Sequence, residues 1–125
     1  MRLLLDTHVF LWAVAGSPRL KAPTRRLIEA AEQVYVSAAS IWEVAIKARL
    51  GKIDADAQAL AEVIEASGFR ELPVSIAHAA GVAQLPLHHH DPFDRLLIAQ
   101  ALAEPLKLVT ADAVLRKYSD VVLLI

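Results

Sequence analysis

Four carboxylates stand where the chain is expected to bring polar groups together. Asp6 and Asp112 each follow an apolar run that is typical of a buried strand, and Glu43 and Asp94 lie within helical patterns. In an open α/β sheet the carboxyl ends of the strands form the ligand crevice. Acids that converge there repel one another unless a divalent cation lies between them. The pattern therefore predicts a metal site and, through it, hydrolysis of a phosphodiester.

Each acid also has a structural interpretation when it is taken alone. Asp6 and Asp112 could each cap the helix that follows. Asp91 precedes a proline, as an N-cap residue would, and this assignment places Asp94 in the first turn, where a carboxylate favours the helix dipole. We therefore assign Asp91 to capping and prefer Asp94 for the metal, and Asp112 stays open between ligand and cap.

Glu43 has the most unusual surroundings of the four acids. It is spaced i, i+4 from Lys47, which is a common surface ion pair. However, the apolar segment 41–46 surrounds it, and an acid among apolar side chains needs a partner or a cation. Lys47 and Arg95, each close to a proposed site acid along the chain, are the cations that we expect to contact phosphate.

The consecutive histidines His88, His89 and His90 invite a metal interpretation. Neighbouring residues cannot readily turn three imidazoles onto one ion, so we interpret the segment as a polar surface loop before a helix cap. The loop leads directly into Asp94, which leaves a role beside that acid open.

Strand-like apolar runs alternate with helical periods along the whole chain, which predicts parallel βαβ units. We expect a three-layer α/β/α sandwich around a mostly parallel sheet, in a single domain over residues 1–125. The expected strands are 3–5, 34–36, 69–74, 106–110 and 121–124. The expected helices are 7–15, 24–32, a segment capped by Ser37 or Ser40 and running to residue 50, 56–66, 76–83, 92–104 and 112–117.

Composition limits the function classes. An apolar fraction of 56% suits a sheet that is buried on both faces. The absence of cysteine excludes a disulfide framework, a thiolate zinc site and a cysteine nucleophile. The formal net charge of −1 gives no strong basic field, but a metal nuclease need not be basic because bound cations restore positive charge locally.

The first residues mimic a short secretory signal, but Asp6 and His8 would lie in its apolar core. No uninterrupted apolar run reaches the ~18 residues that a membrane-spanning helix needs. We expect a cytoplasmic protein.

Four segments carry a family resemblance. Residues 3–8, Leu-Leu-Leu-Asp-Thr-His, resemble the opening of PIN-domain proteins, and residues 37–44 with Lys47 resemble their second acidic motif. Residues 91–101 resemble the third motif and residues 108–112 the fourth. Their order covers nearly the whole chain, and chains of this length resemble the VapC-type toxins of toxin–antitoxin pairs.

The resemblance implies an endoribonuclease that depends on Mg²⁺ or Mn²⁺ and cleaves single-stranded or loop RNA with a metal-activated water. The products would carry a 5′-phosphate and a 3′-hydroxyl. In the family one or two cations are held by the acids that correspond to Asp6, Glu43, Asp94 and Asp112, and the last position is the most variable. Thr110 matches a position where the family often has a hydroxyl, which would orient an acid or a metal-bound water.

The resemblance further implies a homodimer, formed through apolar helix faces, and a cognate antitoxin that inhibits the toxin. Two other functions compete with it. A catalytically silent PIN-like binding module would keep the fold alone. A phosphohydrolase of the haloacid-dehalogenase type also begins with a strand ending in Asp, but it needs a second Asp two residues later, where this chain has His8.

Overall fold

The computed structural model describes all 125 residues and contains a five-stranded parallel sheet with the strand order β3-β2-β1-β4-β5. The strands are β1 (Arg2–Leu5), β2 (Gln33–Ser37), β3 (Arg70–Leu72), β4 (Lys107–Thr110) and β5 (Val122–Leu124). The helices are α1 (Thr7–Ala15), α2 (Ala22–Ala30), α3 (Ala38–Arg49), α4 (Ala57–Ala66), α5 (Ile76–Gly81) and α6 (Pro92–Ala103), with the 3₁₀ helices η1 (Val82–Gln84) and η2 (Ala113–Lys117).

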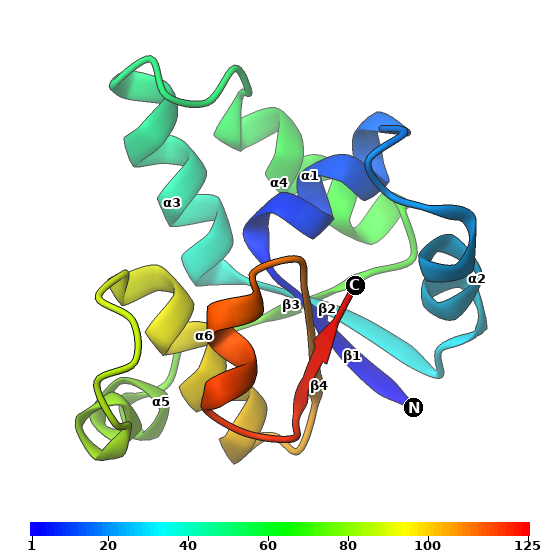
Figure 1. Ribbon diagram of the computed structural model, residues 1–125. Helices are drawn as coiled ribbons and strands as arrows, with labels where there is room; N and C mark the ends of the chain where they lie inside the picture. Colours follow the sequence, from blue (N-terminus) through cyan, green and yellow to red (C-terminus); the bar gives the residue numbers. More distant parts are fainter.

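Helices cover both faces of the sheet (Figure 1). Side chains of β1 alternate between the faces, so that Leu3 and Leu5 join one buried cluster while Leu4 joins the other. The first cluster packs under α1, α2 and α4 and includes the fully buried Phe10; the second packs under α6 and η2. The expected three-layer sandwich is confirmed, and every strand pair in it is parallel.

The strand order places a topological switch point beside β1, and the region at the carboxyl ends of β1 and β4 is here called the crevice. The chain runs outward from β1 to β2 and β3, and then returns to build β4 and β5 on the other side of β1. The segment after β1 forms α1 on one face, whereas the segment after β4 forms η2 on the other. The carboxyl ends of β1 and β4 therefore flank the topological switch point, where open α/β sheets bind their ligands.

The element boundaries differ from expectation in ways that proline explains. Helix α2 begins two residues earlier than expected, at Ala22, because Pro23 has the fixed φ and missing N–H that suit a first turn. Strand β3 ends at Leu72, before Pro73, which has no N–H to donate to a sheet. The expected helix 76–83 divides into α5 and η1, and the segment after Asp112 is a 3₁₀ helix.

Helix α1 ends at Gly16, whose φ of 63° is in the left-handed region. Its N–H reaches the carbonyls of Ala13 and Trp12, a helix termination that glycine adopts without strain. This turn directs the chain away from the sheet toward α2. No helix in the structure combines the length and the hydrophobicity that crossing a membrane requires.

Candidate functional site

Asp6 lies directly after β1 and is buried, with 7% of its surface exposed. Its Oδ1 accepts a hydrogen bond of 2.8 Å from the backbone N–H of Val9, so it caps α1. Its Oδ2 accepts a hydrogen bond of 2.5 Å from the Thr110 hydroxyl. Each oxygen has a second lone pair, so both bonds leave the carboxylate able to accept a further ligand.

Thr110 joins the carboxyl ends of β1 and β4. While its hydroxyl donates to Asp6, it also accepts a hydrogen bond of 3.0 Å from the N–H of Asp112. Asp112 uses Oδ1 to cap η2 through the N–H of Val114, at 3.0 Å. Its Oδ2 lies 3.5 Å from His89 Nε2. One carboxylate therefore serves as a cap with one oxygen and faces the crevice with the other.

Glu43 reaches the site from α3 and is only 3% exposed. Its Oε1 accepts a hydrogen bond of 2.6 Å from the Thr7 hydroxyl, which also lies 2.9 Å from the Ser40 hydroxyl. Its Oε2 pairs with the ammonium of Lys47. The i, i+4 pair is thus present, but Glu43 is part of a buried polar network that joins α1 to α3 rather than a surface ion pair.

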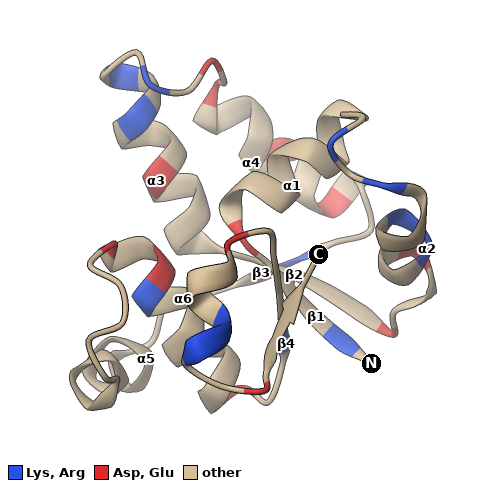
Figure 2. Cartoon of the chain, viewed as in Figure 1, with Lys and Arg blue, Asp and Glu red and all other residues tan.

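The fourth acid, Asp94, lies in the first turn of α6. Asp91 caps this helix, because its Oδ1 accepts from the N–H groups of Phe93 and Asp94 at 2.9 and 3.1 Å. The capping assignment of Asp91 is therefore confirmed. Asp94 turns its Oδ2 to His89 Nε2, at 3.1 Å. Figure 2 shows acidic segments on α3, at the start of α6 and on the loop after β4.

These acids interact strongly through their charges. Burial and, after it, the negative charges of Asp91, Asp6 and Glu43 together raise the pKa of Asp94 to about 7, although His89 acts to lower it. Burial also raises the pKa of Asp6, although its hydrogen bonds act against the change. The chain has therefore gathered carboxylates that oppose one another's ionisation, and a divalent cation would remove that opposition.

Lys47 is a basic side chain beside this charge, paired with Glu43. Burial lowers its pKa, but the hydrogen bond and charge of Glu43 and the charges of Asp91 and Asp94 outweigh burial and raise it. The ammonium stays protonated at neutral pH and remains a positive charge at the edge of the acidic site. The contact of Lys47 with a phosphate stays a prediction.

Arg95 was expected to contact a phosphate, but its guanidinium instead forms hydrogen bonds within the protein. It donates to the carbonyls of Pro86 and Val82 at 3.0 and 3.3 Å and to the Tyr118 hydroxyl at 3.2 Å. Successive residues of an α-helix point about 100° apart, so Arg95 faces the loop before α6 while Asp94 faces the crevice. Arg95 holds this loop in place.

Sequence reasoning did not single out three of the side chains that complete this arrangement. Thr7 and Ser40 bond within the Glu43 network, and His89 approaches both Asp94 and Asp112. In the sequence, only the position of the histidine run shortly before Asp94 indicated that one of these histidines could contact that acid. Nothing in the run distinguished His89 from its neighbours His88 and His90, whose side chains are exposed.

The donor set fits a hard divalent cation. Carboxylate oxygens are the ligands that Mg²⁺ prefers, and one ligand atom from each of Asp94, Asp112 and His89 lies within 4.8 Å of the others. Asp6 and Glu43 add buried negative charge close enough to act on Asp94. The arrangement gathers the kinds of ligand atom that hold a divalent cation.

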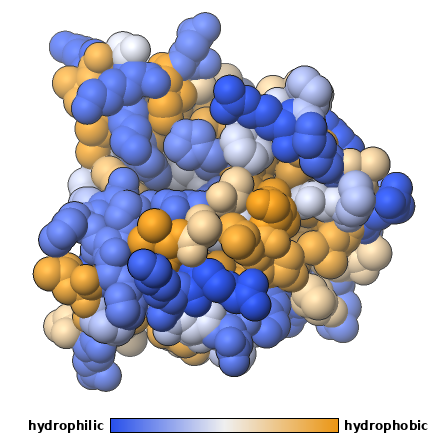
Figure 3. Space-filling view, in the orientation of Figure 1, coloured by the Kyte–Doolittle hydropathy of each residue, from blue (hydrophilic) through white to orange (hydrophobic).

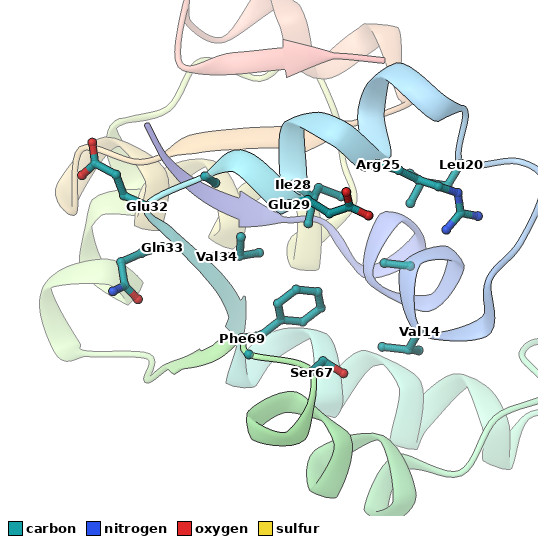
Figure 4. A pocket seen from close by; sticks show the side chains of 13 residues that line it. Val14, Leu20, Arg25, Ile28, Glu29, Glu32, Gln33, Val34, Ser67 and Phe69 are labelled. Atoms are coloured by element: carbon teal, nitrogen blue, oxygen red, sulfur yellow. The ribbon is translucent and has the colours of Figure 1, made fainter.

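A cavity of about 370 Å³ lies elsewhere, between α1, α2 and the segment after α4. Figure 4 shows the ring of Phe69 extending into it, with Val14, Ile28 and Val34 around the ring. It opens beside the first residues of β2, and none of the four acids lines it. Its lining mixes apolar side chains with charged ones such as Arg25 and Glu29, and the cavity is separate from the acidic site.

Comparison with known proteins agrees with this geometry. The family model described as PIN domain matches residues 3–121. A ribonuclease, VapC22 of Mycobacterium tuberculosis, is 33% identical over 118 residues, covering 93% of this chain and 91% of that protein.

Two solved structures share the fold. VapBC2 from Rickettsia felis, bound to a DNA fragment from its promoter, has a TM-score of 0.72 at 18% identity, covering 100% of this chain and 98% of that chain. FitAcB from Neisseria gonorrhoeae has a TM-score of 0.67 at 22% identity, covering 100% of this chain and 97% of that chain.

Proposed function

Because this chain belongs to the PIN domain family, we propose that it is a metal-dependent endoribonuclease, the toxin of a type II toxin–antitoxin pair. The observation that carries the proposal is a group of acids beside the switch point between β1 and β4. One ligand atom from each of Asp94, Asp112 and His89 lies within 4.8 Å of the others, and the charges of Asp6 and Glu43 act on Asp94. Burial, followed by the negative charges of Asp91, Asp6 and Glu43, raises the pKa of Asp94 to about 7. A cluster of this kind is costly for the fold, and a bound cation accounts for it.

We assign the cation site to Asp6, Glu43, Asp94 and Asp112, and the cation to Mg²⁺ or Mn²⁺. When bound, such a cation would neutralise charge on the phosphate and lower the pKa of water for in-line attack at phosphorus. Thr110 keeps the Asp6 carboxylate turned into the crevice through its 2.5 Å hydrogen bond. Lys47 places a permanent positive charge where the phosphate approaches.

The reaction is hydrolysis of a phosphodiester. The oxygen of water forms a bond to phosphorus, the bond from phosphorus to the 3′-oxygen breaks, and the leaving 3′-oxygen takes up a proton. The products are a 5′-phosphate and a 3′-hydroxyl. The hydroxyls that bond to the acids, those of Thr7 and Thr110, are buried and not free to attack a substrate, so we assign the role of nucleophile to water.

Single-stranded RNA is the substrate that the surface beside the site favours. Trp42 precedes Glu43 on α3 and is 58% exposed. Its ring packs edge-on against Phe93, which precedes Asp94, with the centroids 5.1 Å apart. Lys47 Nζ lies 5.9 Å from the centre of the Phe93 ring. The exposed Trp42 ring, supported by the half-buried Phe93 beside a cation, would stack an unpaired base while its phosphate enters the site.

We propose a protein antitoxin as the partner, since the similar structures include complexes described as VapBC2 and as a toxin–antitoxin complex from Klebsiella pneumoniae. Hydrophobic atoms gather on the visible surface over β5 and along the outer side of α3 (Figure 3). Exposed apolar side chains, among them Leu50 and Ile76, support homodimer formation through helix faces.

We propose that residues 1–125 form a single domain and that the protein acts in the cytoplasm, where its RNA substrate is.

The test is cleavage of a labelled single-stranded RNA by the wild-type protein in Mg²⁺ or Mn²⁺, with and without EDTA. Asp6→Asn and Asp94→Asn remove charge from the site with little change in volume. Asp54→Asn, an exposed acid outside the site, is the matched control. We expect both site variants and the chelated wild type to be inactive and the control to be active. Cleavage that is indifferent to EDTA and to both substitutions would refute the proposal.

Calorimetric titration with Mg²⁺ and Mn²⁺ separates the enzyme from a catalytically silent module with the same fold. A nuclease binds the cation, whereas the absence of binding would favour the silent module. The haloacid-dehalogenase alternative is set aside because the chain belongs to a different family and has His8 where the second Asp would be needed.

A further inference from the structure

The imidazole of His89 lies between two acids of the proposed site. Its Nε2 is 3.1 Å from Asp94 Oδ2 and 3.5 Å from Asp112 Oδ2. The two acids come from different parts of the fold, since Asp94 is on α6 and Asp112 follows β4. His89 is therefore the one nitrogen donor that faces both carboxylates across the crevice.

These separations match the spacing of ligands around a small cation. With metal–ligand bonds of about 2.1 Å in octahedral geometry, adjacent ligand atoms lie about 3 Å apart and opposite ones about 4.2 Å apart. The measured 3.1 and 3.5 Å need only small side-chain shifts to fit this pattern, and all three ligand atoms lie within 4.8 Å of one another. The three side chains can thus share one ion.

Both backbone polar groups of His89, its N–H and its carbonyl, form hydrogen bonds with Tyr118. Its N–H donates to the Tyr118 hydroxyl at 2.8 Å, and that hydroxyl donates to the His89 carbonyl at 3.3 Å. Arg95 donates to the same hydroxyl and to the carbonyl of Pro86. The ring of Tyr118 packs edge-on against His88, with centroids 5.1 Å apart. Such support is what a ligand on a loop needs to keep its position.

We propose that His89 Nε2 is a ligand of the catalytic cation, together with Asp94 and Asp112, and that it makes the site prefer Mn²⁺ to Mg²⁺. This inference rests on the proposed function, because it concerns the same cation. Mg²⁺ binds oxygen ligands almost exclusively, whereas first-row transition ions also accept imidazole. Replacing one oxygen ligand by nitrogen therefore costs Mg²⁺ affinity and favours Mn²⁺.

The decisive measurement is pulsed electron paramagnetic resonance of the protein loaded with Mn²⁺, which detects a directly coordinated ¹⁴N nucleus without any turnover. His89→Gln removes the imidazole, and His90→Gln is the matched control in the same loop with an exposed side chain. We expect nitrogen coupling in the wild type and in His90→Gln and none in His89→Gln. In calorimetry, His89→Gln should weaken Mn²⁺ binding by about tenfold and Mg²⁺ binding by less.

The outcomes separate this inference from the proposed function. Mn²⁺ bound by the wild type without nitrogen coupling would overturn the role of His89 and leave the acidic metal site intact. No binding of either cation by the wild type would overturn both. Because the wild-type spectrum alone decides whether nitrogen is coordinated, the test holds even if His89→Gln folds poorly.

Discussion

The hydroxyl of Thr110 donates a 2.5 Å hydrogen bond to Asp6 Oδ2 although the two residues are 104 positions apart in the chain. This bond crosses from the end of β4 to the end of β1, the two strands that flank the crevice. It fixes the direction of a buried carboxylate that also caps α1. The position of Asp6 in the site therefore depends on the pairing of β1 with β4.

Replacing Thr110 by Val keeps the shape of the side chain and removes its hydroxyl. Asp6 then loses one hydrogen-bond donor inside the protein, which should lower the free energy of unfolding by about 1–2 kcal/mol. Metal affinity and RNA cleavage should fall, because the carboxylate is no longer held in one direction. Thr110→Ser, which keeps the hydroxyl donor, should retain most of the stability, the metal affinity and the RNA cleavage. Urea unfolding and calorimetry measure the two effects, and equal behaviour of the Val and Ser variants would contradict the prediction.

Asp94→Asn should stabilise the protein in EDTA at pH 8. The folded-state pKa of Asp94, about 7, lies above its ordinary value of 3.8, so the folded state holds this proton more tightly than the unfolded state does. The carboxylate therefore destabilises the fold progressively as pH rises from about 4 to 7, and fully above that. Because Asn carries no charge, we expect a gain of about 1–3 kcal/mol at pH 8 and little gain near pH 4.

The check on this prediction is urea unfolding at both pH values, with Asp54→Asn as the control that should show no pH-dependent gain. Addition of Mg²⁺ should stabilise the wild type and leave Asp94→Asn unchanged, since the variant lacks a ligand. A variant that is less stable than the wild type at pH 8 in EDTA would show that the acids do not oppose one another as described.

Asp112→Asn tests whether this side chain is a ligand or only a cap. Asparagine caps helices as well as aspartate does, so the N–H of Val114 keeps its acceptor and the unfolding midpoint should stay close to that of the wild type. If Asp112 holds the cation through its other oxygen, Mn²⁺ affinity should fall about tenfold or more. Unchanged affinity with unchanged stability would assign Asp112 to capping alone.

Trp42→Ala tests the stacking surface. Loss of one base–aromatic contact costs about 1–3 kcal/mol, so KM for a single-stranded RNA should rise about tenfold while kcat changes little. Leu102→Ala removes an exposed apolar side chain near the end of α6, outside the surfaces proposed for RNA or dimer contact, and serves as the control. A similar rise in KM for both variants would indicate a general surface effect. Loss of dimer formation by Trp42→Ala, with an unchanged KM, would assign the side chain to a protein interface instead.

Local sequence signals predicted the elements of this fold well. Helix α1 spans the expected residues, and Ser37 and Asp91 cap α3 and α6 through their side chains. Cap residues, proline and apolar periodicity act over a few positions, so the sequence alone reveals them. Ser40, the alternative cap of α3, is buried one turn inside the helix beside Thr7.

The remaining features depend on distant parts of the chain. The bond from Thr110 to Asp6 requires β4 to pair with β1, and neither strand encodes its neighbour. The approach of His89 depends on a loop whose path is set by Arg95 and Tyr118. Arg95 itself adjoins Asp94 in sequence but points elsewhere, because a helix turns each successive side chain about 100°. Its expected phosphate contact could not be judged without the path of this loop.

The two hydrogen bonds of Asp6 have an evolutionary consequence. An asparagine at this position could still accept from the N–H of Val9 and donate to the hydroxyl of Thr110, so α1 and the contact between β1 and β4 would survive. Only the negative charge would be lost. Codons for aspartate and asparagine differ by one nucleotide. A single transition can therefore turn this chain into an inactive copy that folds and keeps its binding surfaces, which makes the silent form an accessible descendant of the enzyme.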